Sequence, residues 1–354
     1  MSGAWVLYTM QNSPYSDKVR ALLRYKRLAV DERIENAETR FSVLQARTGK
    51  TMVPVLVTPD DRAINDSTAI AAHVEKTVPE PPTRWSDPVA DTVAMLLEDY
   101  ADEWLVRIML SSRWYHPADA AQNAAVIATN MTQGLIGLDF QRAAKEFPPG
   151  IIGTLPKMGA TPQNAEGWYG MLPRILAAMD EALAASPFLA GSSPHQCDFA
   201  FYGQLNQIRR DPTGSEWIAR APARVGEWMS RIEAACTGGA VPVARGLTDL
   251  TSLQALVHEM AGTYLRMQIA NAIAVDAGAD HVDTDLVGGF PFRAPPAKYN
   301  AKLLASNLDR LERLLSGGHE MPDILFAPLR LELGALRDAG SRNLAERPAL
   351  HAQL

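Results

Sequence analysis

Cysteine is scarce in this sequence of 354 residues, which contains only Cys197 and Cys236. Two thiols cannot form the disulfide framework of a secreted domain, so we expect a reducing compartment, the cytoplasm. Long apolar runs are missing too, because no uncharged stretch reaches the roughly 20 residues that a membrane-spanning helix needs. The N-terminal residues also lack the pattern of a signal peptide. A membrane is therefore not an expected partner.

An excess of basic residues is also absent, since the formal net charge is −6. Proteins that bind nucleic acid usually carry a basic stripe or surplus, so nucleic acid is not an expected partner either. The seven histidines are scattered along the chain. No spacing of His, Cys and carboxylate residues resembles a metal site, and the sequence predicts no metal cofactor.

The first 80 residues alternate between strand and helix patterns. Ala4–Thr9 is a short apolar run typical of a buried strand. Ser13-Pro14 is typical of a helix start, with a hydroxyl at the N-cap and proline in the first turn. Val53–Val57 is a second β-rich run, and Asp66-Ser67 begins another helix. The pattern predicts a mixed α/β unit over residues 1–80.

A proline-rich linker at 76–88 separates this unit from a chain in which only helices are expected. Helices are predicted at 91–115, 118–146, 171–185, 198–210, 222–235, 248–277 and 301–315. The Gly- and Pro-rich stretch 147–170 is predicted to be a long loop. The pair Gly238-Gly239 marks a further boundary. We therefore expect an all-helical domain at 88–237 and an additional helical segment at 240–354.

The segment Ser13-Pro14-Tyr15-Ser16 lies between the first strand and the first helix, where thioredoxins and glutaredoxins carry Cys-Pro-Tyr-Cys. Disulfide exchange needs thiolates, so two serines exclude that chemistry. A hydroxyl at a helix N-terminus can instead stabilise a thiolate that is brought in from outside. Lowering a thiol pKa by one or two units takes roughly 1.4–2.7 kcal/mol, which a hydroxyl hydrogen bond and the helix dipole can supply.

Three landmarks together resemble the glutathione-transferase superfamily. They are the Ser13–Ser16 segment with the following Lys18–Leu23, the pair Val53-Pro54, and Asn65–Ile70. The resemblance implies that Ser13 donates a hydrogen bond to the glutathione sulfur. Ser16 and Tyr8 remain alternatives for that role, and Ser13 is also explained by helix capping alone.

The same resemblance implies how glutathione itself is held. The backbone of Val53, before a cis Pro54, would pair with the cysteinyl part. Asp66 would meet the ammonium group of the γ-glutamyl part, and Ser67, at a helix start, its carboxylate. Asp66-Ser67 is equally an ordinary capping pair, so the ligand role depends on the resemblance.

One face of the helix expected at 91–115 carries Tyr100, Trp104 and Arg107, spaced i, i+4 and i+7. Such a stripe is either core or the aromatic wall of a cleft for a second substrate. In the second case Arg107 would attract an anionic group.

Gly191–Leu205 resembles the signature of the transferase C-terminal domain, in which an aspartate caps a helix. His195 stands where the family has Ser or Thr three residues before Asp198, and we expect this change to weaken the reciprocal capping box. Other segments resemble a little-studied bacterial group that carries an extra C-terminal helical segment.

The resemblance implies a thioredoxin-like N-terminal domain that binds glutathione and an all-α domain that holds the second substrate. The expected activity is attack of the glutathione thiolate on an electrophilic, apolar small molecule, by conjugation, elimination or isomerisation. Glutathione would be the co-substrate or cofactor. A non-catalytic ligand-binding or scaffold protein of the same fold is the alternative. Members of the family are usually dimers, so a homodimer is expected.

Overall fold

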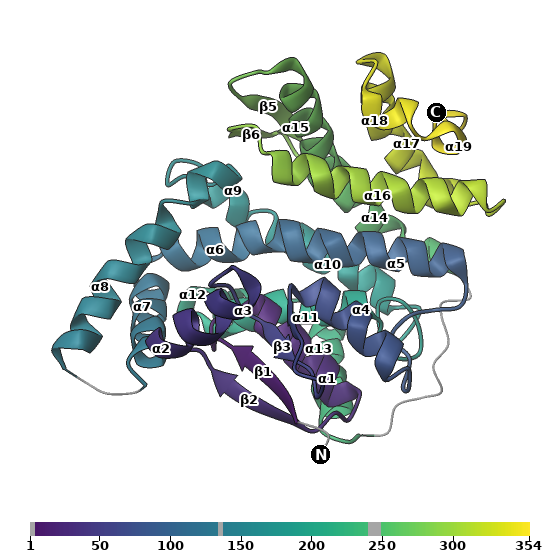
Figure 1. The fold of residues 1–354 in the computed structure, drawn as a ribbon. Coiled ribbons are helices and arrows are strands. Elements are labelled where there is room, and N and C mark those ends of the chain that lie inside the picture. The colour runs from purple at the N-terminus through teal and green to yellow at the C-terminus, as the bar shows by residue number, and fades with distance from the viewer. Residues whose placement is uncertain (1–3, 134–136, 240–248) are drawn as a thin grey trace.

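The computed structural model describes residues 4–133, 137–239 and 249–354. Its N-terminal part is a four-stranded sheet with helices on both faces (Figure 1). The strand order is β2-β1-β3-β4, with β1 parallel to β2 and the other neighbours antiparallel. The elements are β1 (Trp5–Thr9), α1 (Pro14–Tyr25), β2 (Val30–Ile34), α2 (Ala37–Thr39), η1 (Arg40–Gln45), α3 (Ala46–Thr48), β3 (Val55–Val57), β4 (Ala63–Asn65) and α4 (Ser67–Thr77). This order confirms the predicted thioredoxin-like fold.

The period of two along β1 assigns its side chains to opposite faces of the sheet. Leu7 packs with Leu56 of β3 and with residues of α1 and α4. Tyr8 packs on the other face with Val55 and with Leu44 of η1. The N-terminus of α1 thus lies close to the C-terminal end of β1, and α1 packs on the face of the sheet opposite to Tyr8.

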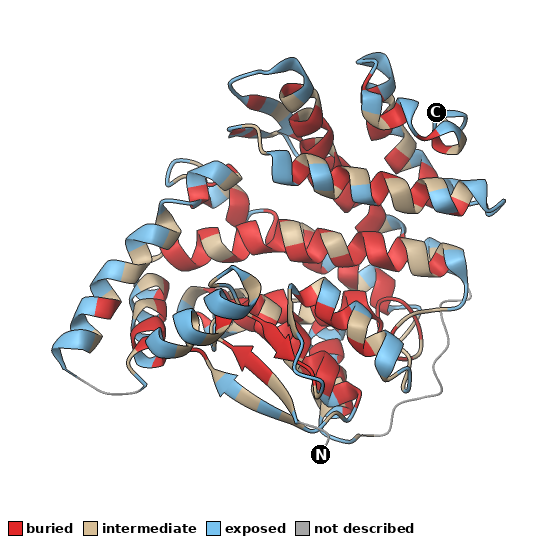
Figure 2. Cartoon of the chain, in the orientation of Figure 1, coloured by how far each residue is buried: buried red, intermediate tan, exposed pale blue. Residues whose placement is uncertain are grey.

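A long helix crosses the middle of the molecule and separates the sheet from the C-terminal segment (Figure 1). It consists of α5 (Pro88–Tyr100), the π-helical turn η2 (Ala101–Leu105) and α6 (Val106–Tyr115). Asp87 caps its start, with Pro88 in the first turn, and a further proline, Pro117, follows its end. Most of the helix is buried (Figure 2), because it is covered from both sides.

Two predictions about the middle of the chain are wrong. The helix expected over 118–146 is two helices, and the expected loop 147–170 is largely helical. The elements are α7 (Pro117–Met131), α8 (Leu138–Ile152), η3 (Leu155–Met158) and α9 (Ala165–Tyr169). α8 continues through Pro148 and Pro149, since Phe147, Ile151 and Ile152 around them pack against the main core. Tertiary packing here outweighs the local cost of proline.

The helices expected at 171–185, 198–210 and 222–235 are present, with one more between the last two. They are α10 (Leu172–Leu183), α11 (Gln196–Arg210), α12 (Pro212–Ala219) and α13 (Ala223–Cys236). The expectation of a weakened cap at α11 is wrong. His195 Nδ1 accepts from the backbone N–H of Cys197 at 3.3 Å, and Asp198 Oδ2 accepts from the N–H of His195 at 2.9 Å. An imidazole nitrogen replaces the usual hydroxyl, so the reciprocal box still forms.

The C-terminal segment was predicted to be purely helical, and this prediction is wrong because the segment also contains a β-hairpin. Its elements are η4 (Leu250–Leu253), α14 (Gln254–Met260), η5 (Ala261–Leu265), α15 (Arg266–Ala277), β5 (Val282–Leu286), β6 (Phe290–Ala294), α16 (Lys298–Ser316), α17 (Asp323–Asp338), α18 (Arg342–Ala345) and α19 (Pro348–His351). Gly288 and Gly289, with φ of 84° and 74°, make the turn between the strands. Residues 240–248, where this segment was predicted to begin, lie outside the described residues.

Candidate functional site

A cavity of about 340 Å³ lies where the thioredoxin-like domain, the long helix and α16 meet. Its lining residues come from five parts of the chain: Tyr15, Lys50, Met52, Val53, Pro54, Asn65, Asp66, Ser67, Thr68, Asp102, Glu103 and Tyr299. Val53, Pro54, Asp66 and Ser67, which the sequence predicted as glutathione ligands, therefore share one cavity. Tyr15 forms its link to α1, and its hydroxyl donates to the backbone oxygen of Asp102 at 3.0 Å.

Asp66 is the N-cap of α4. Its Oδ1 accepts from the backbone N–H groups of Thr68 and Ala69, at 2.9 and 3.2 Å. One carboxylate oxygen is thereby used for capping, and the other remains for a ligand. Asp66 adopts a φ of 88°, which is unusual for a residue other than glycine and is found often at binding sites. The buried Ser67 follows and adds a helix N-terminus to the cavity wall.

The peptide bond between Val53 and Pro54 is cis, as the resemblance implied. This segment leads directly into β3, so its backbone lies at the end of the central strands. Asn65 of β4 donates from Nδ2 to the backbone oxygen of Met52 at 3.1 Å. That hydrogen bond holds the two cavity-lining segments, before β3 and before α4, side by side.

Ser13 is the N-cap of α1, and its Oγ accepts from the backbone N–H of Ser16 at 3.2 Å. The hydroxyl hydrogen of Ser13 has no acceptor among the described residues, so it can be donated to a ligand. Ser13 is buried and does not itself line the cavity.

The two alternatives to Ser13 lie in different surroundings. Ser16 is fully buried, and its Oγ accepts from the backbone N–H of Met10 at 3.2 Å. Tyr8 lies on the face of the sheet away from α1, beside Arg33, whose Nη1 is 3.4 Å from its hydroxyl oxygen. A sulfur at the N-terminus of α1 would therefore be nearer to the two serines than to Tyr8.

Buried charges behind the cavity join α1 to the long helix. Lys18 Nζ lies 2.5 Å from Glu98 Oε1 and 2.5 Å from Asp102 Oδ2. One ammonium group cannot neutralise two carboxylates. Burial and the neighbouring Glu98 raise the pKa of Asp102 to about 8, against the charge of Lys18. Burial acts in the same direction on Glu98, but the charge of Lys18 outweighs it and lowers that pKa.

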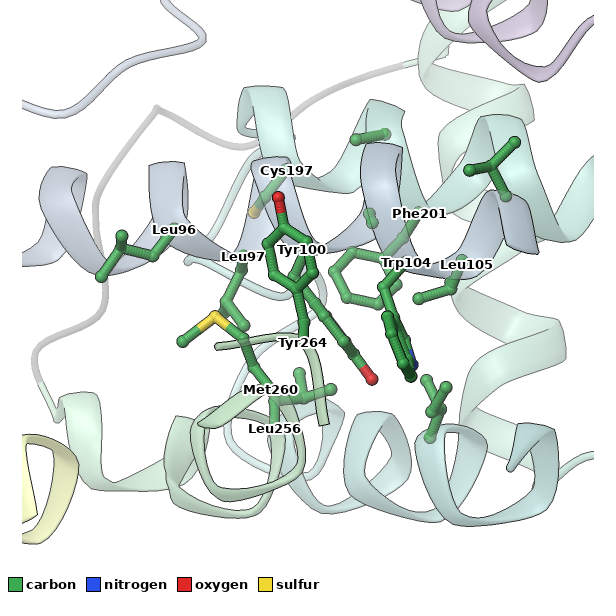
Figure 3. Close-up of a cluster of buried hydrophobic side chains, with 14 of the residues drawn as sticks. Leu96, Leu97, Tyr100, Trp104, Leu105, Cys197, Phe201, Leu256, Met260 and Tyr264 are labelled. Atoms are coloured by element: carbon green, nitrogen blue, oxygen red, sulfur yellow. The ribbon is translucent and has the colours of Figure 1, made fainter. Parts of the chain in front are cut away.

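Tyr100, Trp104 and Arg107 do not line a cleft in this structure. Tyr100 and Trp104 are 0% exposed, and Figure 3 shows their rings beside Tyr264, from the C-terminal segment. The Trp104 ring also lies 5.1 Å from that of Trp168 of α9. The C-terminal segment and α9 pack on the face that was predicted to form an aromatic wall, and the stripe is core.

Arg107 is likewise buried, and its N–H groups donate to other atoms of the protein. It donates to the backbone oxygens of Glu103 at 3.0 Å and Met158 at 2.6 Å. A third donor lies 3.5 Å from Asn300 Oδ1 of α16. These hydrogen bonds hold η3, which ends at Met158, and α16 against the long helix, so the role of Arg107 is structural. Burial lowers the pKa of its guanidinium group.

Polar cavity residues that were not identified from the sequence include Lys50, Asp102, Glu103 and Tyr299. Lys50 and Glu103 had weak local signals, because Lys50 precedes the Val53-Pro54 pair closely and Glu103 adjoins Trp104. Tyr299 had none, since its partner Glu103 is 196 positions away in the chain.

Among the residues that the structure describes, no group of His, Cys, Asp and Glu could hold a metal ion. In the same ranges, no helix has the length and apolar character that crossing a membrane requires.

Several known structures are similar to this one at low identity. A β-etherase from Sphingobium sp. strain SYK-6 is 19% identical, with a TM-score of 0.47, over 66% of this chain and 96% of the other. A glutathione S-transferase from Rhodospirillum rubrum F11 is 18% identical, with a TM-score of 0.38, over 71% and 99%. A glutathione S-transferase from Methylobacterium radiotolerans, in complex with glutathione sulfonate, is 20% identical, with a TM-score of 0.42, over 70% and 98%. No curated protein sequence matches the chain.

Two family models match separate parts of the sequence. The model of the glutathione S-transferase N-terminal domain matches residues 7–82. The model of the glutathione S-transferase C-terminal domain matches residues 162–231. The first match contains Ser13, Val53-Pro54 and Asp66-Ser67, and the second contains the capping box of α11. The chain therefore contains regions that match both domains of the glutathione S-transferases, in the order in which that family has them.

Proposed function

We propose that this protein binds glutathione in the cavity between the thioredoxin-like domain and the long helix, and activates its thiol for attack on an electrophilic small molecule. The observation that carries the proposal is the convergence of Val53, Pro54, Asp66 and Ser67 on one cavity. Glutathione has one ammonium and two carboxylate groups. Asp66 suits the ammonium, while Ser67 and Lys50 suit carboxylates.

The thiol would be activated at the N-terminus of α1. Ser13 can donate its free hydroxyl hydrogen to the sulfur, and the helix dipole favours negative charge there. The sulfur then attacks an electrophilic atom of the second substrate, with the rate gained from a larger thiolate population and from proximity. Conjugation, elimination and isomerisation all begin with this activated thiolate.

The ultraviolet absorbance of bound glutathione thiolate, measured against pH, tests the proposal. In the wild-type complex the thiol should titrate roughly one to two pH units below free glutathione, and Ser13→Ala should reverse most of that shift and lower turnover at least about tenfold. Ser16→Ala is the matched control, because it removes the neighbouring hydroxyl. A normal thiolate shift in Ser13→Ala together with a lost shift in Ser16→Ala would transfer the role to Ser16.

A non-catalytic ligand-binding protein is the second candidate. The burial of Tyr100, Trp104 and Arg107 favours it, because the expected wall of the second-substrate cleft is occupied by the C-terminal segment. Retention on immobilised glutathione without a thiolate shift, and without turnover of a panel of electrophiles, would support this function over the enzyme.

We further propose that the protein acts in the cytoplasm as a homodimer, as the family resemblance implies. Both cysteines, Cys197 and Cys236, are free thiols, which suits a reducing compartment. Sedimentation velocity tests the assembly, and cell fractionation tests the location. A monomer at micromolar concentration would refute the dimer without affecting the proposed chemistry.

A further inference from the structure

One wall of the glutathione cavity is built by a part of the chain that follows both matched family domains. Tyr299, the second residue of α16, lines the cavity and is 57% exposed. Its hydroxyl donates a hydrogen bond to Glu103 Oε1 at 2.7 Å. Glu103 lies in η2 and lines the cavity too. The C-terminal segment therefore contributes a side chain to the site and holds a carboxylate there.

Three carboxylates line this small cavity: Asp66, Asp102 and Glu103. Asp102 is only 5% exposed, and although its Oδ2 faces Lys18, its Oδ1 has no hydrogen-bond partner among the described residues. A buried carboxyl oxygen without a partner is a polar atom that a ligand in the cavity would satisfy.

Glu103 is also incompletely compensated. Burial raises its pKa to about 7, although the hydrogen bond from Tyr299 and the charge of Arg107 act in the opposite direction. The guanidinium of Arg107 donates to the backbone oxygen of Glu103 and to Met158. A cationic group bound in the cavity would stabilise the ionised form of Glu103.

The ligand that the proposed function places here carries such a group. We propose that Glu103, positioned by Tyr299, binds the α-ammonium group of the γ-glutamyl residue together with Asp66, and so determines specificity for a free amino group. This inference rests on the proposed binding of glutathione. An ammonium group has three hydrogens to donate. Oδ1 of Asp66 already accepts two hydrogen bonds at the start of α4, so Asp66 offers only one further oxygen. Glu103 provides the second acceptor, because Tyr299 fixes its Oε1 and its Oε2 has no hydrogen-bond partner in the part of the chain that the structure describes.

Calorimetric titration with two ligands tests this assignment. The ligands are glutathione and its des-amino analogue, in which a glutaryl group replaces γ-glutamyl and only the ammonium is lost. The proteins are the wild type, Glu103→Gln, Tyr299→Phe and Glu216→Gln. Glu216, on α12, is exposed and far along the chain from the cavity, so its variant controls for the loss of one negative charge. Circular dichroism and thermal melting confirm that each variant is folded.

The ratio of the two affinities is the decisive quantity. We expect the wild type and Glu216→Gln to prefer glutathione by about tenfold or more, because a charged hydrogen bond is lost with the analogue. Glu103→Gln should reduce that preference about tenfold while changing the affinity for the analogue less than about twofold. Tyr299→Phe should reduce the preference by a smaller factor, because it loosens Glu103 without removing its charge.

Two other outcomes refute different statements. If Glu103→Gln weakens both ligands equally, or neither, the ammonium role is wrong while the proposed function stands. If the wild type binds neither ligand, the proposed function and this inference both fall. If Tyr299→Phe keeps the wild-type preference, Glu103 can still bind the ammonium group, but the proposed positioning of Glu103 by Tyr299 of the C-terminal segment is wrong.

Discussion

Lys18 and Asp102 form an ion pair of 2.5 Å in which both side chains are almost closed to solvent, at 2% and 8% exposure. Lys18 lies one turn after the Ser13 cap in α1, and Asp102 precedes Glu103 in the long helix. This contact therefore fixes the distance between the helix N-terminus that would activate the thiol and the carboxylate that would bind the ammonium group. The two walls of the site are joined by one buried charge.

Removing that charge should destabilise the protein. Lys18→Met leaves Glu98 and Asp102 buried without their cation, and we expect the free energy of unfolding to fall by about 3–5 kcal/mol. Arg24→Met is the matched control on the same helix, because Arg24 is 58% exposed and lies 3.9 Å from Glu32, and its loss should cost less than about 1 kcal/mol. Urea denaturation measures both, and equal costs would contradict the structural role of Lys18.

Asp66 should contribute to affinity through its charge and to stability through its cap. Asp66→Ala should weaken glutathione binding by about 1–3 kcal/mol, the usual cost of losing a charged hydrogen-bond partner. Asp66→Asn keeps a capping oxygen and tolerates a positive φ, so it should lose affinity while melting near the wild-type temperature. Calorimetry and thermal melting separate the two effects. An unchanged affinity in Asp66→Asn would remove the carboxylate from the site.

The buried Asp99 should make stability depend on pH. Its Oδ2 accepts from Tyr264 and Asn307, at 2.7 and 2.6 Å, and burial raises its pKa to about 6. The folded state therefore holds the Asp99 proton more tightly than the unfolded state does. The contribution of this proton to the free energy of unfolding is fully present below pH 4 and is lost as the pH rises through 6. The loss is about 3 kcal/mol.

Asp99→Asn removes this titration. The variant should therefore gain stability relative to the wild type as the pH increases from 4 to 7, when urea unfolding is measured across that range. Asp283→Asn, at a carboxylate 62% exposed, serves as the control and should show no such trend. Parallel stability curves for Asp99→Asn and the wild type over that range would mean that folding does not raise the pKa of Asp99.

Trp104 should behave as a core residue and not as part of a substrate cleft. Trp104→Ala removes a fully buried ring that packs on Trp168 and Tyr264, and we expect a loss of about 3–5 kcal/mol in the free energy of unfolding. Trp5→Ala, at a half-buried position of β1, should cost less. If Trp104→Ala were as stable as the wild type, Trp104 would not be a core residue, and its assignment to the core would be wrong.

The sequence by itself determined the thioredoxin-like domain and the members of its candidate site, because their signals are local. Ser13 before Pro14, and Asp66 before Ser67, start helices through the chemistry of their own side chains. The pair Val53-Pro54 carries its own backbone constraint. Each of these features depends on residues a few positions apart, and their order along the chain was enough to indicate the family whose domain models match.

Only the tertiary structure decided what lies on the other side of the long helix. The spacing of Tyr100 and Trp104 shows that they share a face, but burial depends on what packs against that face, and here Tyr264 and Trp168 do. The hairpin at 282–294 and the turn of α8 through two prolines are stabilised in the same way, by contacts outside their own segments. Tyr299 reaches Glu103 across 196 positions. Such a contact leaves no local signal in the sequence, because its energy comes from residues that only folding brings together.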